Sequence, residues 1–130
     1  MSQENVEIVK RAIQAFARHD LDAIEDHPDV EVDWSLSRGL EAGIYRGREA
    51  AHRFWDTFYE TFDRVVVVPE ELIEHGDCVI VLDRTRLRGR DGIEVEAHNV
   101  SVATVRDGRI VQWRLCRDRA EALKAVGLEG

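Results

Sequence analysis

The last quarter of the chain carries the pattern that most restricts its fold. Two strand-like segments flank Asp107-Gly108, a pair that tolerates the positive φ angles of a tight hairpin turn. Asp118 and Glu121 then form a variant of the capping box that opens a helix, and Gly127 is placed to end that helix. The segment therefore predicts a strand, a hairpin turn, a second strand and a capped helix.

The spacing of apolar residues predicts the elements that come before this segment. Helices are predicted over about 3–18, 21–26 and 49–62. A strand is predicted over 30–35, and a loop with a short strand over 36–47. Four consecutive strands follow as a meander, at about 64–74, 78–88, 94–106 and 109–117. Helices followed by hairpins predict an α+β domain with helices on one face of an antiparallel sheet.

Length and charge limit the classes of protein to which the chain can belong. Its 130 residues suit a single domain, 1–130. The net charge of −8 argues against nucleic acid as a partner, since binding it requires a basic face. The longest apolar run, Val65 to Val68, is far below the roughly 20 residues of a membrane span. The first residues lack the pattern of a signal peptide, so we expect a cytoplasmic protein with Cys78 and Cys116 reduced.

Three motifs that follow one another along the chain resemble motifs of a single protein superfamily. The segment 16–22 resembles the exit of the first helix in nuclear-transport-factor-2-like (NTF2-like) proteins, and 45–50 resembles their loop-to-helix motif. The 107–110 hairpin and its helix resemble the SnoaL-like polyketide cyclase branch. The resemblance covers nearly the whole chain. It implies a cone-shaped fold, in which a curved antiparallel sheet wraps three N-terminal helices around a pocket, and a homodimer through the convex sheet face.

Strand alternation assigns side chains to the pocket that this resemblance implies. Aligning the strands by their turns places three groups on the concave face: Ile80, Leu82, Arg84 and Arg86; Asn99, Ser101 and Ala103; Val111, Trp113, Leu115 and Arg117. The opposite wall is expected to hold Trp34, Phe54, Trp55 and Phe58. The predicted substrate-binding residues are Trp34, Phe54, Trp55, Phe58, Arg84, Asn99, Ser101, Trp113 and Arg117. A one-residue bulge would flip a strand and exchange Asn99 for His98.

Two activities known on this fold fit the sequence poorly. Ketosteroid isomerase chemistry needs a carboxylate base, a Tyr and a protonated Asp, but these positions correspond here to Trp34, Ala12 and Ser101. Limonene epoxide hydrolase chemistry needs two carboxylates bridged by an Arg. Asp83 and Arg84 are adjacent and should face opposite ways, and no second acid is evident on the Arg84 face. We therefore predict that steroid isomerase activity is absent.

The resemblance to SnoaL-like cyclases implies a pocket Asp or His as the acid–base group. His98 is the candidate, with Asp83 behind it, because histidine titrates near neutral pH. The alternative for His98 is packing on the convex face at a dimer interface. No pair of residues has metal-ligand spacing, so neither a metal nor a cofactor is predicted.

These observations predict a small-molecule-binding, SnoaL-like protein. The leading hypothesis is a cofactor-independent enzyme of the isomerase, cyclase or hydratase type, acting on a hydrophobic substrate with a carbonyl or anionic end. The anionic end would pair with Arg84 and Arg117, unless Arg84 pairs with Asp56 and Arg117 with Asp118 or Glu121. The alternative is a non-catalytic ligand-binding or dimerisation domain.

Overall fold

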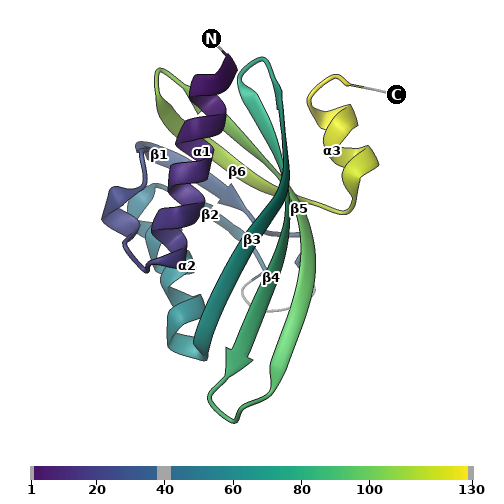
Figure 1. The fold of residues 1–130 in the computed structure, drawn as a ribbon. Coiled ribbons are helices and arrows are strands. Elements are labelled where there is room, and N and C mark those ends of the chain that lie inside the picture. The colour runs from purple at the N-terminus through teal and green to yellow at the C-terminus, as the bar shows by residue number, and fades with distance from the viewer. Residues whose placement is uncertain (1, 38–41, 129–130) are drawn as a thin grey trace.

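Six strands form one sheet in the order β2-β1-β6-β5-β4-β3 (Figure 1). The computed structural model describes residues 2–37 and 42–128. The helical elements are α1 (Ser2–Ala17), the 3-10 turn η1 (Leu21–Ala23), α2 (Arg48–Thr61) and α3 (Arg119–Ala125). The strands are β1 (Asp26–Asp33), β2 (Ile44–Arg46), β3 (Phe62–His75), β4 (Cys78–Gly89), β5 (Glu94–Arg106) and β6 (Arg109–Cys116). The predicted α+β order is therefore confirmed, although residues 38–41 of the predicted 36–47 loop lie outside the described part of the chain.

The sheet is mixed, where the sequence predicted an antiparallel one. β1 pairs with β6 in parallel, whereas the other neighbouring strands pair antiparallel. Parallel neighbours need a long crossover connection, and α2 together with the meander supplies it between β1 and β6. This pairing brings the end of β1, next to Trp34, beside the middle of β6.

The segment after α1 differs from the predicted second helix over 21–26. Only a 3-10 turn forms, and the side chain of Asp20 makes no capping hydrogen bond to it. The chain then enters β1 at Asp26, earlier than predicted. Pro28 is tolerated there because the register with β6 shifts between Asp26 and Glu31, so regular pairing is interrupted where a proline lacks its N–H.

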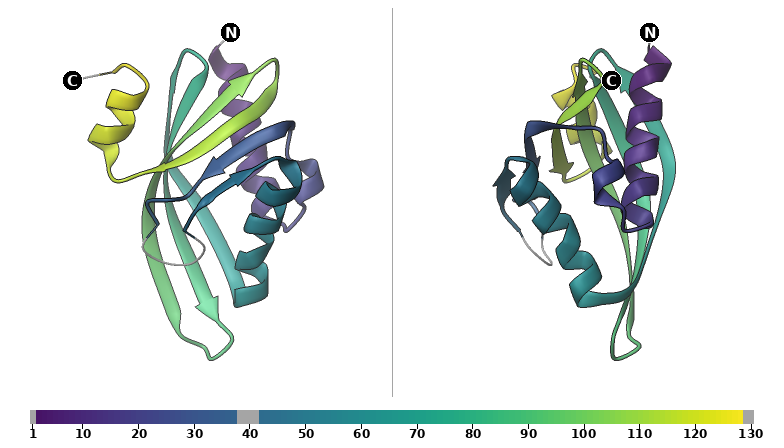
Figure 2. Two further views of the ribbon diagram at one scale, coloured as in Figure 1. Left: turned by 180° about the vertical axis from the view of Figure 1, so that it is seen from behind. Right: turned by 90° about the vertical axis from the view of Figure 1, so that its left-hand side faces the viewer.

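The two faces of the sheet pack against different helices. The inner face packs against α1 and α2, and Val79, Val81 and Ala103 are buried in the core between them. The outer face packs in part against α3, where Ile80 and Val102 form a second cluster. Figure 1 shows α1 and α2 at the left, beside β1 and β2, and α3 at the right, on the other side of β3, β4 and β5. The β4–β5 hairpin extends beyond the helices in every view (Figure 2).

The C-terminal segment folds as its local pattern predicted. Asp107 and Gly108 both have positive φ, 51° and 75°. The Oδ1 of Asp118 accepts a hydrogen bond from the backbone N–H of Glu121 at 2.8 Å. Gly127, with φ of 87°, follows the end of α3 in the left-handed conformation that glycine favours. This hairpin and cap set the direction of β6, which carries Trp113 to the inner face.

Two further features bear on the sequence predictions. The described part of the chain contains no helix that is long and apolar enough to span a membrane. Cys78 and Cys116 are both free thiols, as predicted.

Candidate functional site on the inner face of the sheet

Asp83 is a partly buried acid on the inner face of β4. Its Oδ1 accepts a hydrogen bond from the Thr85 hydroxyl at 2.8 Å and a longer one, at 3.4 Å, from the Asn99 side-chain amide. Burial raises the pKa of the Asp83 carboxyl above its ordinary value, although these two hydrogen bonds oppose the shift. The site therefore holds a carboxyl group that is easier to protonate than an exposed aspartate.

Strand pairing shows why Asp83 faces inward. Residues directly opposite in an antiparallel pair share a face, and Asp83 lies opposite Asn99. Thr85, two residues on, lies opposite Val67 of β3, which packs into the core with the aromatic side chains of α2. Because alternate residues share a face, the polar group of Asp83, Thr85 and Asn99 belongs to the same wall as Val67.

Four aromatic side chains, one just after β1 and three on α2, belong to the main core or pack against it. Phe54 is a buried member of that core, and Trp34, Trp55 and Phe58 are partly buried against it. Phe54 is only 2% exposed and contacts the rings of Trp34 and Phe58, so it supports the others from inside the core. Trp34, Trp55 and Phe58 are only partly buried and remain available to contact a ligand.

Ser101 and Trp113 form a second polar contact on the inner face. The Trp113 Nε1–H donates to the Oγ of Ser101 at 2.9 Å. Ser101 is 1% exposed, so the hydrogen bond is shielded from water and holds the indole in one orientation. The predicted inward placement of Asn99, Ser101 and Trp113 agrees with this geometry.

The inward placement of Ile80, Leu82, Arg84 and Arg86 was wrong. Val79 and Val81 occupy the inner face, and Ile80 packs on the outer face with Leu82. Arg84 pairs with His98 and Arg86 with Glu96, so both arginines follow Ile80 onto the outer face. The period of a strand is two, so an error of one residue in aligning β4 with β5 inverts the whole strand.

His98 and Asp83 therefore lie on opposite faces of the sheet. The His98 side chain is 68% exposed and lies 3.7 Å from Glu70 and 3.6 Å from Glu96. The predicted arrangement of His98 in the pocket with Asp83 behind it does not form. Asn99 faces inward, and His98 takes the outer-face position that the alternative hypothesis gave it.

The predicted pair of pocket arginines does not form either. The side chain of Arg117 is 75% exposed and pairs with Glu121 at 3.3 Å, one of the alternatives considered for it. Arg84 lies on the outer face, where its buried Nε makes no hydrogen bond. Asp56, which the sequence suggested as an internal partner for Arg84, instead contacts His19 at 2.7 Å. These two arginines therefore place no positive charge on the inner face that would bind an anionic ligand.

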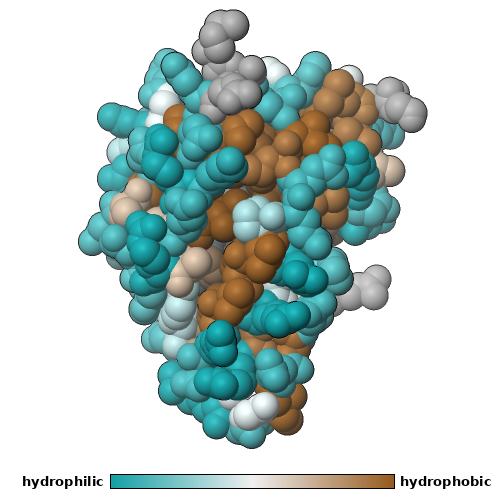
Figure 3. Space-filling view, in the orientation of Figure 1, coloured by the Kyte–Doolittle hydropathy of each residue, from teal (hydrophilic) through white to brown (hydrophobic). Residues whose placement is uncertain are grey.

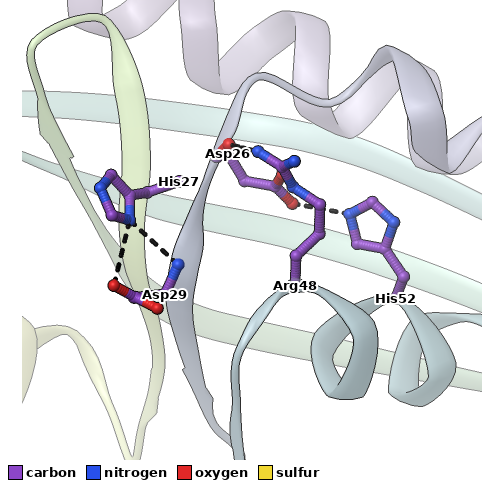
Figure 4. Close-up of polar contacts among 5 residues, drawn as sticks. All are labelled: Asp26, His27, Asp29, Arg48 and His52. Carbon is purple, nitrogen blue, oxygen red and sulfur yellow. Dashed lines mark hydrogen bonds and ion pairs between the residues drawn. The ribbon is translucent and has the colours of Figure 1, made fainter.

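A second polar cluster, which the sequence did not predict, joins β1 to α2 (Figure 4). The side chain of Asp26 is 1% exposed, and its Oδ1 accepts from Arg48 Nε at 2.8 Å. Its Oδ2 lies 2.7 Å from Nε2 of His52, and Arg48 Nη2 also donates to the backbone carbonyl of Asp26. The three residues line an open hollow of about 490 Å³.

Two open hollows of the molecule lie away from Asp83. The hollow beside Asp26 also involves Asp107 and Arg109. Another, of about 450 Å³, lies on the other side of the Asp107-Gly108 turn. Neither hollow is lined by Asp83. Among the described residues, no group of three or more His, Cys, Asp or Glu side chains is arranged to hold a metal ion.

The curved, mixed sheet with helices on its inner face defines a known class of α+β domain. The SnoaL-like domain family matches residues 9–113, and the chain belongs to that family. No functionally curated protein matches the chain in sequence.

Solved structures agree with this assignment. An NTF2-like protein of unknown function from Burkholderia pseudomallei K96243 is 25% identical, with a TM-score of 0.78 over 98% of this chain and 99% of that one. TerC, co-crystallised with polyporic acid, is 23% identical, with a TM-score of 0.77 over 95% and 97% of the two chains. A Mycobacterium tuberculosis protein in complex with estradiol-17β-hemisuccinate is 19% identical, with a TM-score of 0.77 over 93% and 98%. The fold is therefore NTF2-like.

Steroid isomerase activity should be absent from this protein. Ala12, which the sequence prediction matched to the Tyr donor, is buried in the core, and Ser101 is already bonded to Trp113. Trp34, which the sequence prediction matched to the base, has no proton-accepting side-chain group. We expect conversion of a Δ5-ketosteroid, followed by the absorbance of the conjugated product, to stay at the buffer rate. Turnover well above that rate would overturn this prediction.

Proposed function

We propose that this protein binds a hydrophobic small molecule with a carbonyl end on the inner face, and transforms it by acid–base chemistry without a cofactor. The observation that carries the proposal is Asp83, a carboxyl with a raised pKa on the same sheet face as Val67, which packs with the core cluster that contains the aromatic side chains. Perturbed acids beside apolar surfaces are characteristic of catalytic sites. The complexes of structural neighbours with polyporic acid and with a steroid ester support a hydrophobic ligand.

The chemistry available to Asp83 is proton transfer. In its ionised form it can remove a proton from the carbon next to a carbonyl, and in its protonated form it can return that proton at another atom. The side-chain amide of Asn99 donates long hydrogen bonds of 3.4 Å to Asp83 Oδ1 and to Thr85 Oγ1, and we propose that a bound enolate oxygen would replace one of these acceptors. Isomerisation and aldol-type cyclisation of a carbonyl compound begin with this removal of a proton, and hydration of an α,β-unsaturated carbonyl compound ends with return of a proton to the same carbon. Because Arg84 and Arg117 lie elsewhere, we propose a carbonyl end and no longer an anionic one.

The test uses 2-tetralone, a bicyclic aromatic ketone, as a probe of this step. Exchange of its α-protons in D₂O is followed by proton NMR with wild type, with Asp83→Asn, and with the outer-face control His98→Gln. We expect wild type and His98→Gln to accelerate exchange above buffer and Asp83→Asn to fall toward the buffer rate. Binding without acceleration would overturn the catalytic proposal and favour a ligand-binding protein, and equal rates in wild type and Asp83→Asn would exclude Asp83.

We further propose that two copies associate through the outer face. Figure 3 shows apolar side chains gathered along β3 and beside α3. Val68 on β3 is 38% exposed, and beside it the buried Nε of Arg84 makes no hydrogen bond. A second copy would cover the apolar surface and could supply an acceptor to Arg84.

The dimer should be visible in solution. Light scattering at micromolar concentration should give twice the mass of the chain, and Val68→Glu should shift it toward the monomer because a carboxylate would then be buried in the interface. A wild-type mass equal to one chain would contradict the dimer.

A further inference from the structure

We infer that Asp26 is a positioning residue for the inner-face site, and that it acts by fixing α2 through His52 and Arg48. The consequence for activity rests on the proposed function, whereas the effect on α2 can be measured without it. Asp26 touches neither Asp83 nor the inner wall, so its effect must pass through the helix that carries the aromatic side chains.

The second half of α2 is anchored by aromatic contacts with Phe16 and by an ion pair with His19, whereas its first turns bury only two apolar side chains. Within α2, only Ala51 and Phe54 are buried. The helix begins after Gly47, which provides no side-chain cap. The first turns of α2 are held instead by the Asp26 cluster, in which one carboxylate binds two side chains that are a helical turn apart (Figure 4).

Stability alone gives no reason to bury this carboxylate. Taking a charge out of water is costly, and well-packed apolar residues of similar volume are often at least as stabilising as a buried ion pair. A carboxylate that is bonded to two side chains of one helix differs from such packing. It fixes both the position of the helix along its own axis and its rotation about that axis. The Asp26 contacts, at 2.8 Å to Arg48 and 2.7 Å to His52, meet this description.

The rotation of α2 determines where its aromatic side chains lie. The His52 ring lies 5.7 Å from the ring of Trp55, between ring centroids, and Phe58 follows about one turn further along the same helix. Trp55 and Phe58 are partly buried against the core that includes Val67 and Trp113 of the sheet. If α2 turned or slid, these two side chains would move relative to Asp83. A misplacement of about 1 Å can cost about 100-fold in rate.

The experiment compares His52→Leu, which removes one bond to Asp26, with His52→Gln, whose amide can restore it. Arg48→Met is a second disrupting variant, and because the Arg48 side chain is 47% exposed, we expect this variant to fold. Arg11→Met is the matched control, since it breaks the exposed 2.7 Å pair with Glu25 without touching α2. The protein is labelled with 5-fluorotryptophan, and the three fluorine signals are assigned with Trp→Phe variants.

We expect the Trp55 signal to shift or broaden in His52→Leu and Arg48→Met, and to return toward wild type in His52→Gln, with Arg11→Met unchanged. The rate of 2-tetralone exchange at saturating probe should fall about 10- to 100-fold in the two disrupting variants and recover in His52→Gln. An unmoved Trp55 signal, or a moved signal with an unchanged exchange rate, would overturn the inference. If wild type does not catalyse exchange, the proposed function fails, and the fluorine signals still decide whether Asp26 positions α2.

Discussion

Replacing both partners of Asp26, by Arg48→Met with His52→Leu, should lower the free energy of unfolding by about 3–5 kcal/mol. The side chain of Asp26 is 1% exposed, so without these partners its charge would remain buried with no compensating side chain. Breaking a buried ion pair from one side is among the most destabilising kinds of substitution, because the remaining charge retains its desolvation cost.

Urea denaturation measures this effect in wild type, in the double variant, in a triple variant that adds Asp26→Leu, and in the control Arg11→Met. The triple variant should recover most of the loss, because it removes the unpaired charge and fills the site with an apolar side chain. Arg11→Met, which breaks an exposed pair, should leave the free energy of unfolding nearly unchanged. A double variant within about 1 kcal/mol of wild type, or a triple variant no more stable than the double, would contradict a buried charge at Asp26.

The second large effect is expected at Asp83. Asp83→Asn should reduce the catalysed exchange of 2-tetralone by about 10²- to 10⁴-fold, the range that a positioned general base contributes. After subtraction of the buffer rate, the wild-type rate should rise with pH through the pKa of Asp83, because only the ionised carboxylate accepts a proton. Burial raises this pKa, so the rise should lie above the ordinary range of an aspartate. A wild-type rate that does not change over this range would exclude Asp83 as the base.

The raised pKa of Asp83 also predicts that wild type and Asp83→Asn differ in stability, and that the difference depends on pH. A carboxyl whose pKa is higher in the folded than in the unfolded state contributes stability below the unfolded pKa, and loses it as pH rises through the folded pKa. As pH rises above these pKa values, ionisation of the buried Asp83 carboxyl therefore lowers the stability of the fold. Asp83→Asn should be more stable than wild type at neutral pH, and its advantage should vanish in acid; thermal melts across this range measure it.

The features that the sequence predicted correctly are those with local causes. The Asp107-Gly108 turn and the Asp118 cap depend on residues within a few positions of one another, and both formed as predicted. The α+β order and the SnoaL-like family likewise follow from short motifs in a fixed order.

The errors arose where distant segments meet. The inner-face residues of β4 were assigned from turn positions, whereas the pairing of Asp83 with Asn99 sets the register of that strand. A single-residue difference moved Arg84 outward and brought Asp83 and Thr85 inward. The Asp26 cluster was missed because its partners are 22 and 26 residues away, and no motif links them.

The most direct test of the proposed site is a crystal structure of the protein with 2-tetralone bound. The probe should lie on the inner face against Trp55 or Phe58, with its carbonyl oxygen within hydrogen-bond distance of Asn99 or Asp83. A probe bound only in the hollow beside Asp26, or only on the outer face near His98, would contradict the inner-face site.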